Sequence, residues 1–286
     1  MKRFLLVPLV VVLASSGASA RGQAASAPPA AGAPAPPAAK PSRDSLTLVR
    51  ARGKLLACVA PQAPWAIHGP DGALSGFSID VATRLAQDLG VEVVFVPTDF
   101  ASLVQAVAEG ECDVVAGGLS PTPERALFAH FSDAIARHGI AVLADKQAAA
   151  GWKAPADLDR PEVTIGAVAG TAELLEAGRA FPRATLLEVP SWAALGEALL
   201  AGKIQAAVAS DPLPQVAVKL APERVVTPFA EPIGRRGEAL AVRRGDLEFL
   251  AYLNVWVDAR RSDGWLDARA SEWFGRLDWA EAEPKP

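Results

Sequence analysis

The sequence predicts an α/β fold in which parallel strands are joined by crossover helices. The first observation behind this prediction is a regular alternation of short β-type runs with segments of helical period. Strands that alternate with helices of this length pair in parallel. Each helix returns the chain to the end of the sheet at which the previous strand began, so the next strand runs in the same direction. The second observation is an internal repeat, and the third is that both copies of the repeat end in polar residues.

The expected elements follow one another closely along the core of the chain. Apolar runs rich in valine and isoleucine predict strands at 54–59, 91–96, 113–118, 162–168 and 205–210. Apolar residues at helical spacing predict helices at 79–90, 102–110 and 194–202.

The repeat relates residues 102–117 to residues 194–209. Each copy has a leucine near the start of its helix, a glycine that ends the helix, two further residues and an apolar strand. Any helix, glycine and strand in succession would look similar, so this simpler interpretation stays open. The agreement favours two lobes of like topology.

The N-terminal region has two distinctive parts that precede this core. Residues 1–20 combine Lys2 and Arg3 with an apolar stretch and small residues, which predicts a signal peptide cleaved after Ala20 and export to the periplasm. Residues 21–45 are mostly alanine, proline and glycine and predict a semi-extended linker outside the fold.

Charge and cysteine content narrow the class of protein. The formal net charge of −4 disfavours nucleic acid or an anionic membrane surface as a partner. The two cysteines, Cys58 and Cys112, lie in or beside apolar runs. Export permits a disulfide, but a free buried thiol is common in such surroundings, so we expect free thiols and leave pairing open.

Polar residues follow both strands of the repeat. The first strand leads into Ser120, Thr122 and Arg125, and the second leads into Ser210 and Asp211. Ligands of open α/β sheets bind at the carboxyl ends of the strands. A cation from one lobe and an anion from the other would then face each other, which suits a zwitterion.

Five stretches together resemble the family 3 extracellular solute-binding proteins, the periplasmic amino-acid-binding components of ABC importers. They are GALSGFSIDVATRLAQDLG, GGLSPTPER, IGAVAGTAE, LLAGKIQAAVASD and SDGWLDARASEWFG, and the resemblance covers about residues 50 to 276. It implies a type II periplasmic-binding-protein fold with two lobes and two crossover strands. Lobe 1 is expected at 46–142 and 237–279, lobe 2 at 143–236, and a tail at 280–286.

The resemblance assigns the ligand's charged groups to three residues. Arg125 would hold the α-carboxylate, because a guanidinium offers a bidentate fork of donors. Asp211 would receive the ammonium, and Thr171 would give the carboxylate a second contact. Each of the three residues also has a structural interpretation. Arg125 could be a solvated residue on the first turn of a helix that Thr122 caps. Thr171 could simply cap a helix, and Asp211 could cap a helix that begins at the following proline.

The side chain of the ligand is expected to meet a second group of residues. Ser120 offers a hydroxyl, Gly118 allows close approach, and Phe100, Trp65 and Gln62 line the walls. The basic-amino-acid binders of the family carry a tyrosine where this chain has Gln62 and an aspartate where it has Val59. We therefore expect a neutral, even apolar or aromatic, amino acid or a related carboxylate.

No cofactor and no metal site is expected. The histidines His68, His130 and His138 show no metal-ligand spacing and are interpreted as structural. The expected partners are the small-molecule ligand and the membrane permease subunits of an importer, and the protein is expected to be a monomer.

An enzyme is the competing class. The stretches FVPTDFASL, GGLSPTPER and DLDRPEVTI also resemble periplasmic cyclohexadienyl dehydratases, which act on prephenate or arogenate. Glu173 matches the position of their general acid. A glutamate in the first turn of a helix is also favoured by the helix dipole alone, and Ala172 stands where those enzymes carry an asparagine.

Overall fold

The computed structural model describes residues 44–69 and 72–282. The predicted signal peptide and nearly all of the predicted linker lie outside the described residues. The first helix, α1 (Ser45–Arg52), begins inside the last residues assigned to the linker, because Asp44 caps it by accepting from the Thr47 amide. None of the helices in the described part is both long and apolar enough to cross a membrane.

Nine strands form one mixed sheet in the order β4-β1-β5-β11-β6-β9-β7-β8, with β10 paired to β6. On one side lie β1 (Lys54–Val59), β4 (Glu92–Pro97) and β5 (Val114–Val115). On the other lie β7 (Thr164–Val168), β8 (Thr185–Val189) and β9 (Ala206–Ser210). The small remaining strands are β10 (Val225–Val226) and the separate hairpin of β2 (Ile67–His68) with β3 (Leu74–Ser75).

The two sides of the sheet have the same topology, which confirms the repeat. In each, the first strand lies in the middle and pairs in parallel with the next two, giving the orders β4-β1-β5 and β8-β7-β9. The repeated helices α3 (Leu103–Glu109) and α6 (Trp192–Leu200) lead into the equivalent strands β5 and β9. Gly110 and Gly202 both have a left-handed φ, of 82° and 70°, just beyond these helices.

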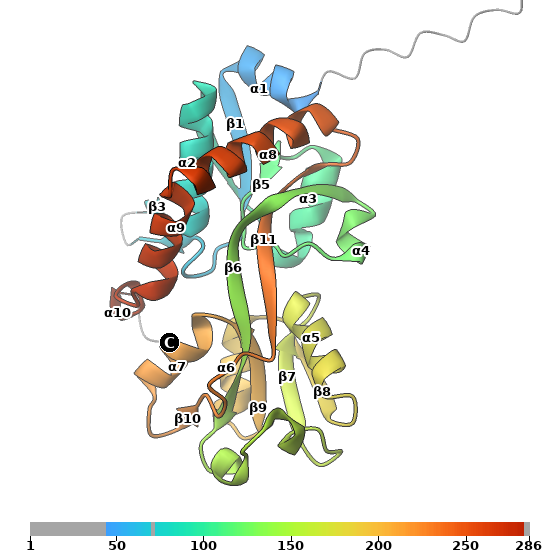
Figure 1. Cartoon of the computed structure of the whole chain (residues 1–286), viewed down its shortest axis with the longest axis vertical. Helices are drawn as coiled ribbons and strands as arrows, with labels where there is room; N and C mark the ends of the chain where they lie inside the picture. Colours follow the sequence, from blue (N-terminus) through green and yellow to red (C-terminus); the bar gives the residue numbers. More distant parts are fainter. Residues whose placement is uncertain (1–43, 70–71, 283–286) are drawn as a thin grey trace, which may run out of the picture. The chain divides into compact units, whose positions relative to one another are not determined.

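Two long strands connect the sides. Figure 1 shows β6 (Ala129–Asp145), in green, running beside β11 (Gly234–Arg243), in orange. They pair antiparallel along their length, with Arg236 opposite His138 and two irregularities of register between Glu238 and Ala241. These are the two crossover strands that the resemblance implies, and they add antiparallel pairing to the predicted parallel sets.

The remaining helices either lie between strands in the chain or follow the last strand, β11. On the side of β1 they are α2 (Phe77–Leu89), α4 (Pro123–Ala126), α8 (Leu247–Ser262), α9 (Trp265–Ala270) and α10 (Trp279–Ala282). On the side of β7 they are α5 (Ala172–Ala180) and α7 (Leu213–Leu220).

Each side of the sheet has a hydrophobic core of its own. One hydrophobic cluster joins residues of β1, β5 and α2 to α8, α9 and the end of β11, with Phe77, Phe249 and Trp256 among its large side chains. Another joins β7 and β9 to the second part of β6, around Ile140, Ile165 and Phe181. The lobe boundaries given above stay a prediction.

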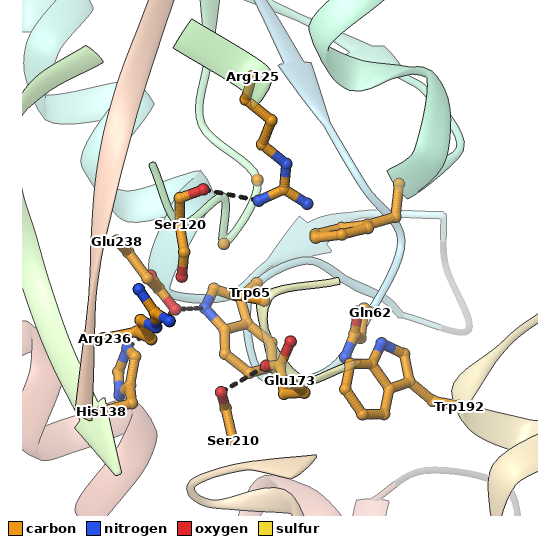
Figure 2. Close-up of a pocket in the computed structure, with 14 residues that line it drawn as sticks. Gln62, Trp65, Ser120, Arg125, His138, Glu173, Trp192, Ser210, Arg236 and Glu238 are labelled. Atoms are coloured by element: carbon orange, nitrogen blue, oxygen red, sulfur yellow. Dashed lines mark hydrogen bonds and ion pairs between the residues drawn. The ribbon is translucent and has the colours of Figure 1, made fainter. Parts of the chain in front are cut away.

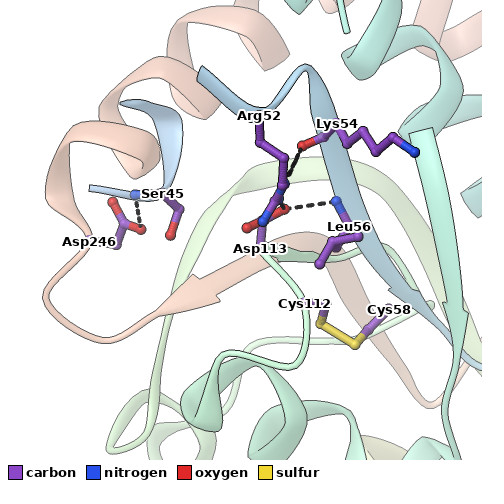
Figure 3. Close-up of polar contacts among 8 residues, drawn as sticks. All are labelled: Ser45, Arg52, Lys54, Leu56, Cys58, Cys112, Asp113 and Asp246. Atoms are coloured by element: carbon purple, nitrogen blue, oxygen red, sulfur yellow. Dashed lines mark hydrogen bonds and ion pairs between the residues drawn. A yellow bond between two sulfur atoms is a disulfide. The ribbon is translucent and has the colours of Figure 1, made fainter. Parts of the chain in front are cut away.

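Cys58 and Cys112 form a disulfide, so the expectation of free thiols is wrong. The reason is the strand register. Cys58 lies opposite Val115 in the parallel pair of β1 with β5, and Cys112 lies two residues before β5, which brings the two Cα atoms to 5.7 Å. Figure 3 shows the bond beside Asp113, whose carboxylate accepts from the Leu56 amide at 2.7 Å and pairs with Arg52.

Candidate ligand-binding site

A cavity lies among the ends of strands from both sides of the sheet and the two crossover strands. Figure 2 shows the residues that line it. The lining consists of Gln62, Trp65, Phe100, Gly117, Gly118, Ser120, Arg125, His138, Ala172, Glu173, Trp192, Ser210, Arg236 and Glu238. It contains six of the eight residues predicted to bind ligand, and also Glu173.

Arg125 is held by the short helix α4. Thr122 caps this helix by accepting from the Arg125 amide at 3.3 Å, and Pro123 occupies its first position, as the sequence indicates. The guanidinium donates to the Ser120 carbonyl at 2.6 Å and to the Gly170 carbonyl at 2.9 Å. Its carbon atom Cζ lies 5.5 Å from the centre of the Phe100 ring, within cation–π range. The fork is therefore oriented before any ligand arrives.

Burial lowers the pKa of Arg125, while the nearby carboxylates of Glu173 and Glu124 act in the opposite direction. An arginine titrates so far above neutral pH that it keeps its charge. The loss of hydration strengthens its attraction for an anion, because the cavity has a lower effective dielectric than water.

The two glycines after β5 make room for protein side chains. Gly118 has a φ of 68°, and a Cβ there would lie 3.0 Å from the Trp65 indole. A Cβ on Gly117 would lie 2.9 Å from a methyl group of Leu103. From the sequence, Gly118 was expected to let the ligand come close to the backbone. In the structure the side chain nearest to Gly118 is Trp65, and the one nearest to Gly117 is Leu103.

Glu173 brings a negative charge into the same cavity from the other side of the sheet. It lies in the first turn of α5, and its carboxylate accepts a hydrogen bond from the Ser210 hydroxyl at the end of β9. The Coulombic influence of Glu173 on Arg125 shows that the two charges lie close to one another. An anion and a cation thus line one cavity.

Thr171 and Asp211 are not among the lining residues. Thr171 is buried and caps α5, donating to the Val168 carbonyl at 2.7 Å and accepting from the Leu174 amide. The cap expected from its structural interpretation is therefore present, and its contact with a ligand carboxylate stays a prediction. Asp211 does not cap α7, whose cap residue is Pro212, and its carboxylate instead accepts from the Gln215 side chain at 2.7 Å.

The crossover strands supply three lining residues that the sequence interpretation missed. His138 of β6 was interpreted as structural, and Arg236 and Glu238 of β11 were not considered. His138 Nε2 lies 2.8 Å from Glu238 Oε1, and the same carboxylate accepts from the Trp65 indole N–H. Charged residues two positions apart on a strand share one face, and this spacing of Arg236 and Glu238 is the signal that could have found them.

The pKa of His138 reflects two opposed influences. Burial acts to lower it, but the charge and hydrogen bonding of Glu238 outweigh burial, with smaller contributions from Asp211 and Glu173, so that the pKa is raised above the ordinary histidine value. His138 and Glu238 lie within ion-pair distance of one another at the edge of the cavity.

Aromatic side chains form the remaining wall. Trp65 is 6% exposed and contacts the His138 ring edge to face with 6.1 Å between centroids. Phe100 and Trp192 line the cavity with Gln62, whose backbone pairs with Ala66 across a tight turn. Trp192, at the start of α6, was missed by the sequence interpretation. Among the described residues, no cluster of three or more histidine, cysteine, aspartate or glutamate side chains could hold a metal.

The sequence of residues 55–276 matches the family model of the bacterial extracellular solute-binding proteins, family 3. The chain belongs to this family. Its fold is the type II periplasmic-binding-protein fold, and its relatives include periplasmic binding proteins.

Relatives of this chain include both a binding protein and an enzyme. The L-cystine-binding protein TcyJ of Escherichia coli is 27% identical over 232 residues, which is 80% of this chain and 86% of TcyJ. The cyclohexadienyl dehydratase of Pseudomonas aeruginosa is 25% identical over 222 residues, which is 78% of this chain and 82% of the enzyme.

Solved family structures agree closely with this fold. The ancestral amino acid-binding protein AncCDT-1, described as a precursor of cyclohexadienyl dehydratase, has a TM-score of 0.72 and 30% identity, covering 80% of this chain and 99% of that one. A putative ABC transporter binding component from Wolinella succinogenes, complexed with lysine, has a TM-score of 0.73 and 27% identity with the same coverage.

Proposed function

We propose that this protein binds a neutral amino acid or a related carboxylate in the periplasm and delivers it to the membrane subunits of an ABC importer. The observation that carries the proposal is the presence of Arg125 and Glu173 in one cavity, contributed by opposite sides of the sheet. A zwitterion offers a carboxylate to the first and an ammonium to the second. Charge-assisted hydrogen bonds of this kind are about twice as strong as neutral ones.

Arg125 is suited to the α-carboxylate. Its bonds to the Ser120 and Gly170 carbonyls fix the plane of the guanidinium and leave other N–H groups for a ligand. Ser120 adds a hydroxyl beside it. Thr171 caps α5, so its contribution would be to hold the N-terminal turn that carries Glu173.

Glu173 takes the ammonium in this proposal, instead of Asp211. Glu173 lines the cavity and is oriented by the Ser210 hydroxyl, whereas the carboxylate of Asp211 is bonded to Gln215 outside the lining. Trp65, Phe100, Trp192 and Gln62 form the aromatic and polar wall of the same cavity. Two relatives described as probable binding proteins of amino-acid ABC transporters support delivery to an ABC permease.

The direct test is a thermal-shift screen of residues 21–286 against the common amino acids. A ligand present at 100 times its dissociation constant adds about 2.7 kcal/mol to the free energy of unfolding, which is readily measured. We expect a neutral amino acid to raise the melting temperature. If none of the amino acids raises it, the proposed function is wrong.

A second candidate is a dehydratase that acts on prephenate or arogenate. The observation that favours it is Glu173, which lines the cavity and accepts a hydrogen bond from Ser210. The chain is also 25% identical to the Pseudomonas aeruginosa dehydratase over 222 residues. A carboxylic acid at this place has the chemistry to protonate a departing hydroxyl. The two candidates differ in one measurable property: only a dehydratase would turn over prephenate or arogenate.

A further inference from the structure

One part of the cavity has polar groups that the proposed contacts with the α-amino and α-carboxyl groups do not use. Arg236 and Glu238 lie two residues apart on β11, and His138 faces Arg236 across the strand pair. Figure 2 shows these three side chains together at one side of Trp65, away from Gln62 and Trp192.

One carboxylate oxygen of Glu238, Oε2, accepts no hydrogen bond from the described residues. Only 3% of Glu238 is exposed, and its Oε1 is occupied by the Trp65 indole N–H and by the nearby His138 ring. Its Oε2 is buried and has no hydrogen-bond partner within residues 44–69 and 72–282. A buried carboxylate oxygen without a partner costs folding free energy, so a ligand that donates to it gains more than one that does not.

Arg236 offers donors beside this acceptor. One Nη2 hydrogen bond, 3.2 Å long, joins it to the buried carboxylate of Glu176 on α5 and holds the guanidinium in place. The side chain is 36% exposed and lines the cavity, so its other N–H groups can reach a ligand. The subsite thus presents a donor and an acceptor side by side.

We propose that Arg236 and Glu238 form a specificity subsite for a ligand side chain that ends in an uncharged carboxamide or ureido group. The carbonyl oxygen accepts from Arg236, and the N–H donates to Glu238 Oε2. Trp65 connects this subsite to the loop of Arg125, because its indole bonds to Glu238 and lies against Gly118. The inference rests on the proposed function and narrows the neutral ligands that it allows.

Other side chains fit the subsite less well. An apolar side chain leaves both Arg236 and Glu238 Oε2 unpaired in a cavity from which the ligand has displaced water. A cationic side chain can pair with Glu238 but is repelled by Arg236, and a carboxylate can pair with Arg236 but is repelled by Glu238. Sites that hydrogen-bond a polar group reject an analogue without it far more strongly than an apolar pocket rejects a smaller group.

Calorimetry on the mature protein tests this directly. The probes are L-glutamine and L-citrulline for the two proposed groups, with L-glutamate, L-lysine and L-norleucine as matched alternatives of similar length. We expect glutamine or citrulline to bind at least tenfold more tightly than each of the other three. Equal or tighter binding of norleucine, glutamate or lysine overturns the subsite but leaves the proposed function standing, whereas no binding of any amino acid overturns both.

Two neighbouring arginines give a matched pair of variants. Arg236→Met removes the proposed donor, and Arg235→Met removes an adjacent arginine that is 74% exposed and lies outside the cavity lining. The measured quantity is the affinity for glutamine or citrulline divided by the affinity for norleucine. We expect this ratio to fall at least tenfold in Arg236→Met and to change by less than twofold in Arg235→Met.

A purely structural role for Arg236 would weaken all ligands equally and leave this ratio unchanged, which would overturn the proposal. Because Arg236 also holds Glu176, circular dichroism checks that the variant is folded. If Arg236→Met does not fold, Glu238→Gln provides the second measurement: it replaces one acceptor of the subsite by a donor, and the same tenfold loss of preference is expected. An unchanged preference in that variant overturns the proposal.

Discussion

At the scale of single residues, the site depends on charged side chains that neighbouring backbone and side-chain groups hold in place. Arg125 donates to two carbonyls, one from the loop after β5 and one from the loop before α5. Glu173 is oriented by Ser210, and Glu238 by Trp65 and His138. Such preorganisation reduces the entropy that a ligand loses on binding, and each of these charges can be tested by a single substitution.

Arg125→Ala is expected to abolish ligand binding without unfolding the protein. It removes the proposed bidentate partner of the ligand carboxylate, at a cost of about 3 kcal/mol or more, which corresponds to over 100-fold in affinity. Calorimetry on the folded variant measures this. The control is Arg160→Ala, an exposed arginine paired only loosely with Glu162 at 3.7 Å; affinity retained within tenfold by Arg125→Ala would remove Arg125 from the site.

Glu173→Gln distinguishes the binding protein from the dehydratase. The wild type is expected to produce no phenylpyruvate from prephenate and no phenylalanine from arogenate above background. In an enzyme the substitution would remove the transferred proton and lower turnover by about 100-fold or more with substrate binding largely kept. Wild-type turnover that Glu173→Gln eliminates would establish the dehydratase in place of the binding protein.

His138 is expected to make stability depend on pH. Despite burial, its pKa in the folded protein is raised by Glu238, so folding favours the protonated ring. That contribution is fully present below the unfolded pKa of about 6.5 and is lost as pH rises through the higher folded value. The difference in melting temperature between wild type and His138→Gln should therefore shrink from pH 6 to pH 9; a difference that grows over this range would contradict the assignment.

At the scale of elements, the register of β1 with β5 decides which residues are joined. The parallel pairing of Cys58 with Val115 leaves Cys112 next to Cys58, and the same pairing lets Asp113 accept from the Leu56 amide. Asp246, which caps α8, accepts from the Ser45 amide at 3.0 Å and attaches α1 to the same region, as Figure 3 shows.

Removing the disulfide is expected to destabilise the protein by about 4 kcal/mol, because the bond constrains the unfolded chain over a separation of 54 residues. The double variant Cys58→Ala, Cys112→Ala should show this loss in urea denaturation. Reductant should destabilise the wild type similarly and leave the double variant unchanged. Equal stability of wild type with and without reductant would contradict the assigned bond.

At the scale of the whole molecule, β6 and β11 connect two sets of strands that have the same topology. The cavity lies where residues of these long strands meet the loops that follow β5 and β7. A ligand that contacts residues from both sets favours the arrangement in which they lie close together, because only differential affinity shifts a conformational equilibrium.

Ligand is therefore expected to reduce the radius of gyration measured by small-angle scattering. The comparison is the mature protein with and without a saturating concentration of the amino acid found in the thermal-shift screen. Arg125→Ala at the same concentration is the control and should show no change. An unchanged wild-type profile at saturation would count against closure of the two lobes.

The sequence by itself determined the local features of this protein. The α/β class, the repeat with its glycines Gly110 and Gly202, and the capped turn that carries Arg125 all follow from periodicity and short-range chemistry, and the structure has them. Six predicted site residues line the cavity. Ser120 and Arg125 were predicted because they follow the end of a strand, whereas Gln62, Trp65 and Phe100 were predicted from the resemblance to the family.

Only the tertiary structure decided the features that depend on long-range pairing. His138 and Arg236 are far apart in the chain and meet because β6 and β11 pair antiparallel. The same holds for the bond between Cys58 and Cys112, and for Glu173 as the lining carboxylate in place of Asp211. Strand register over such separations is fixed by burial and hydrogen bonding of the complete sheet, which no local pattern in either segment contains.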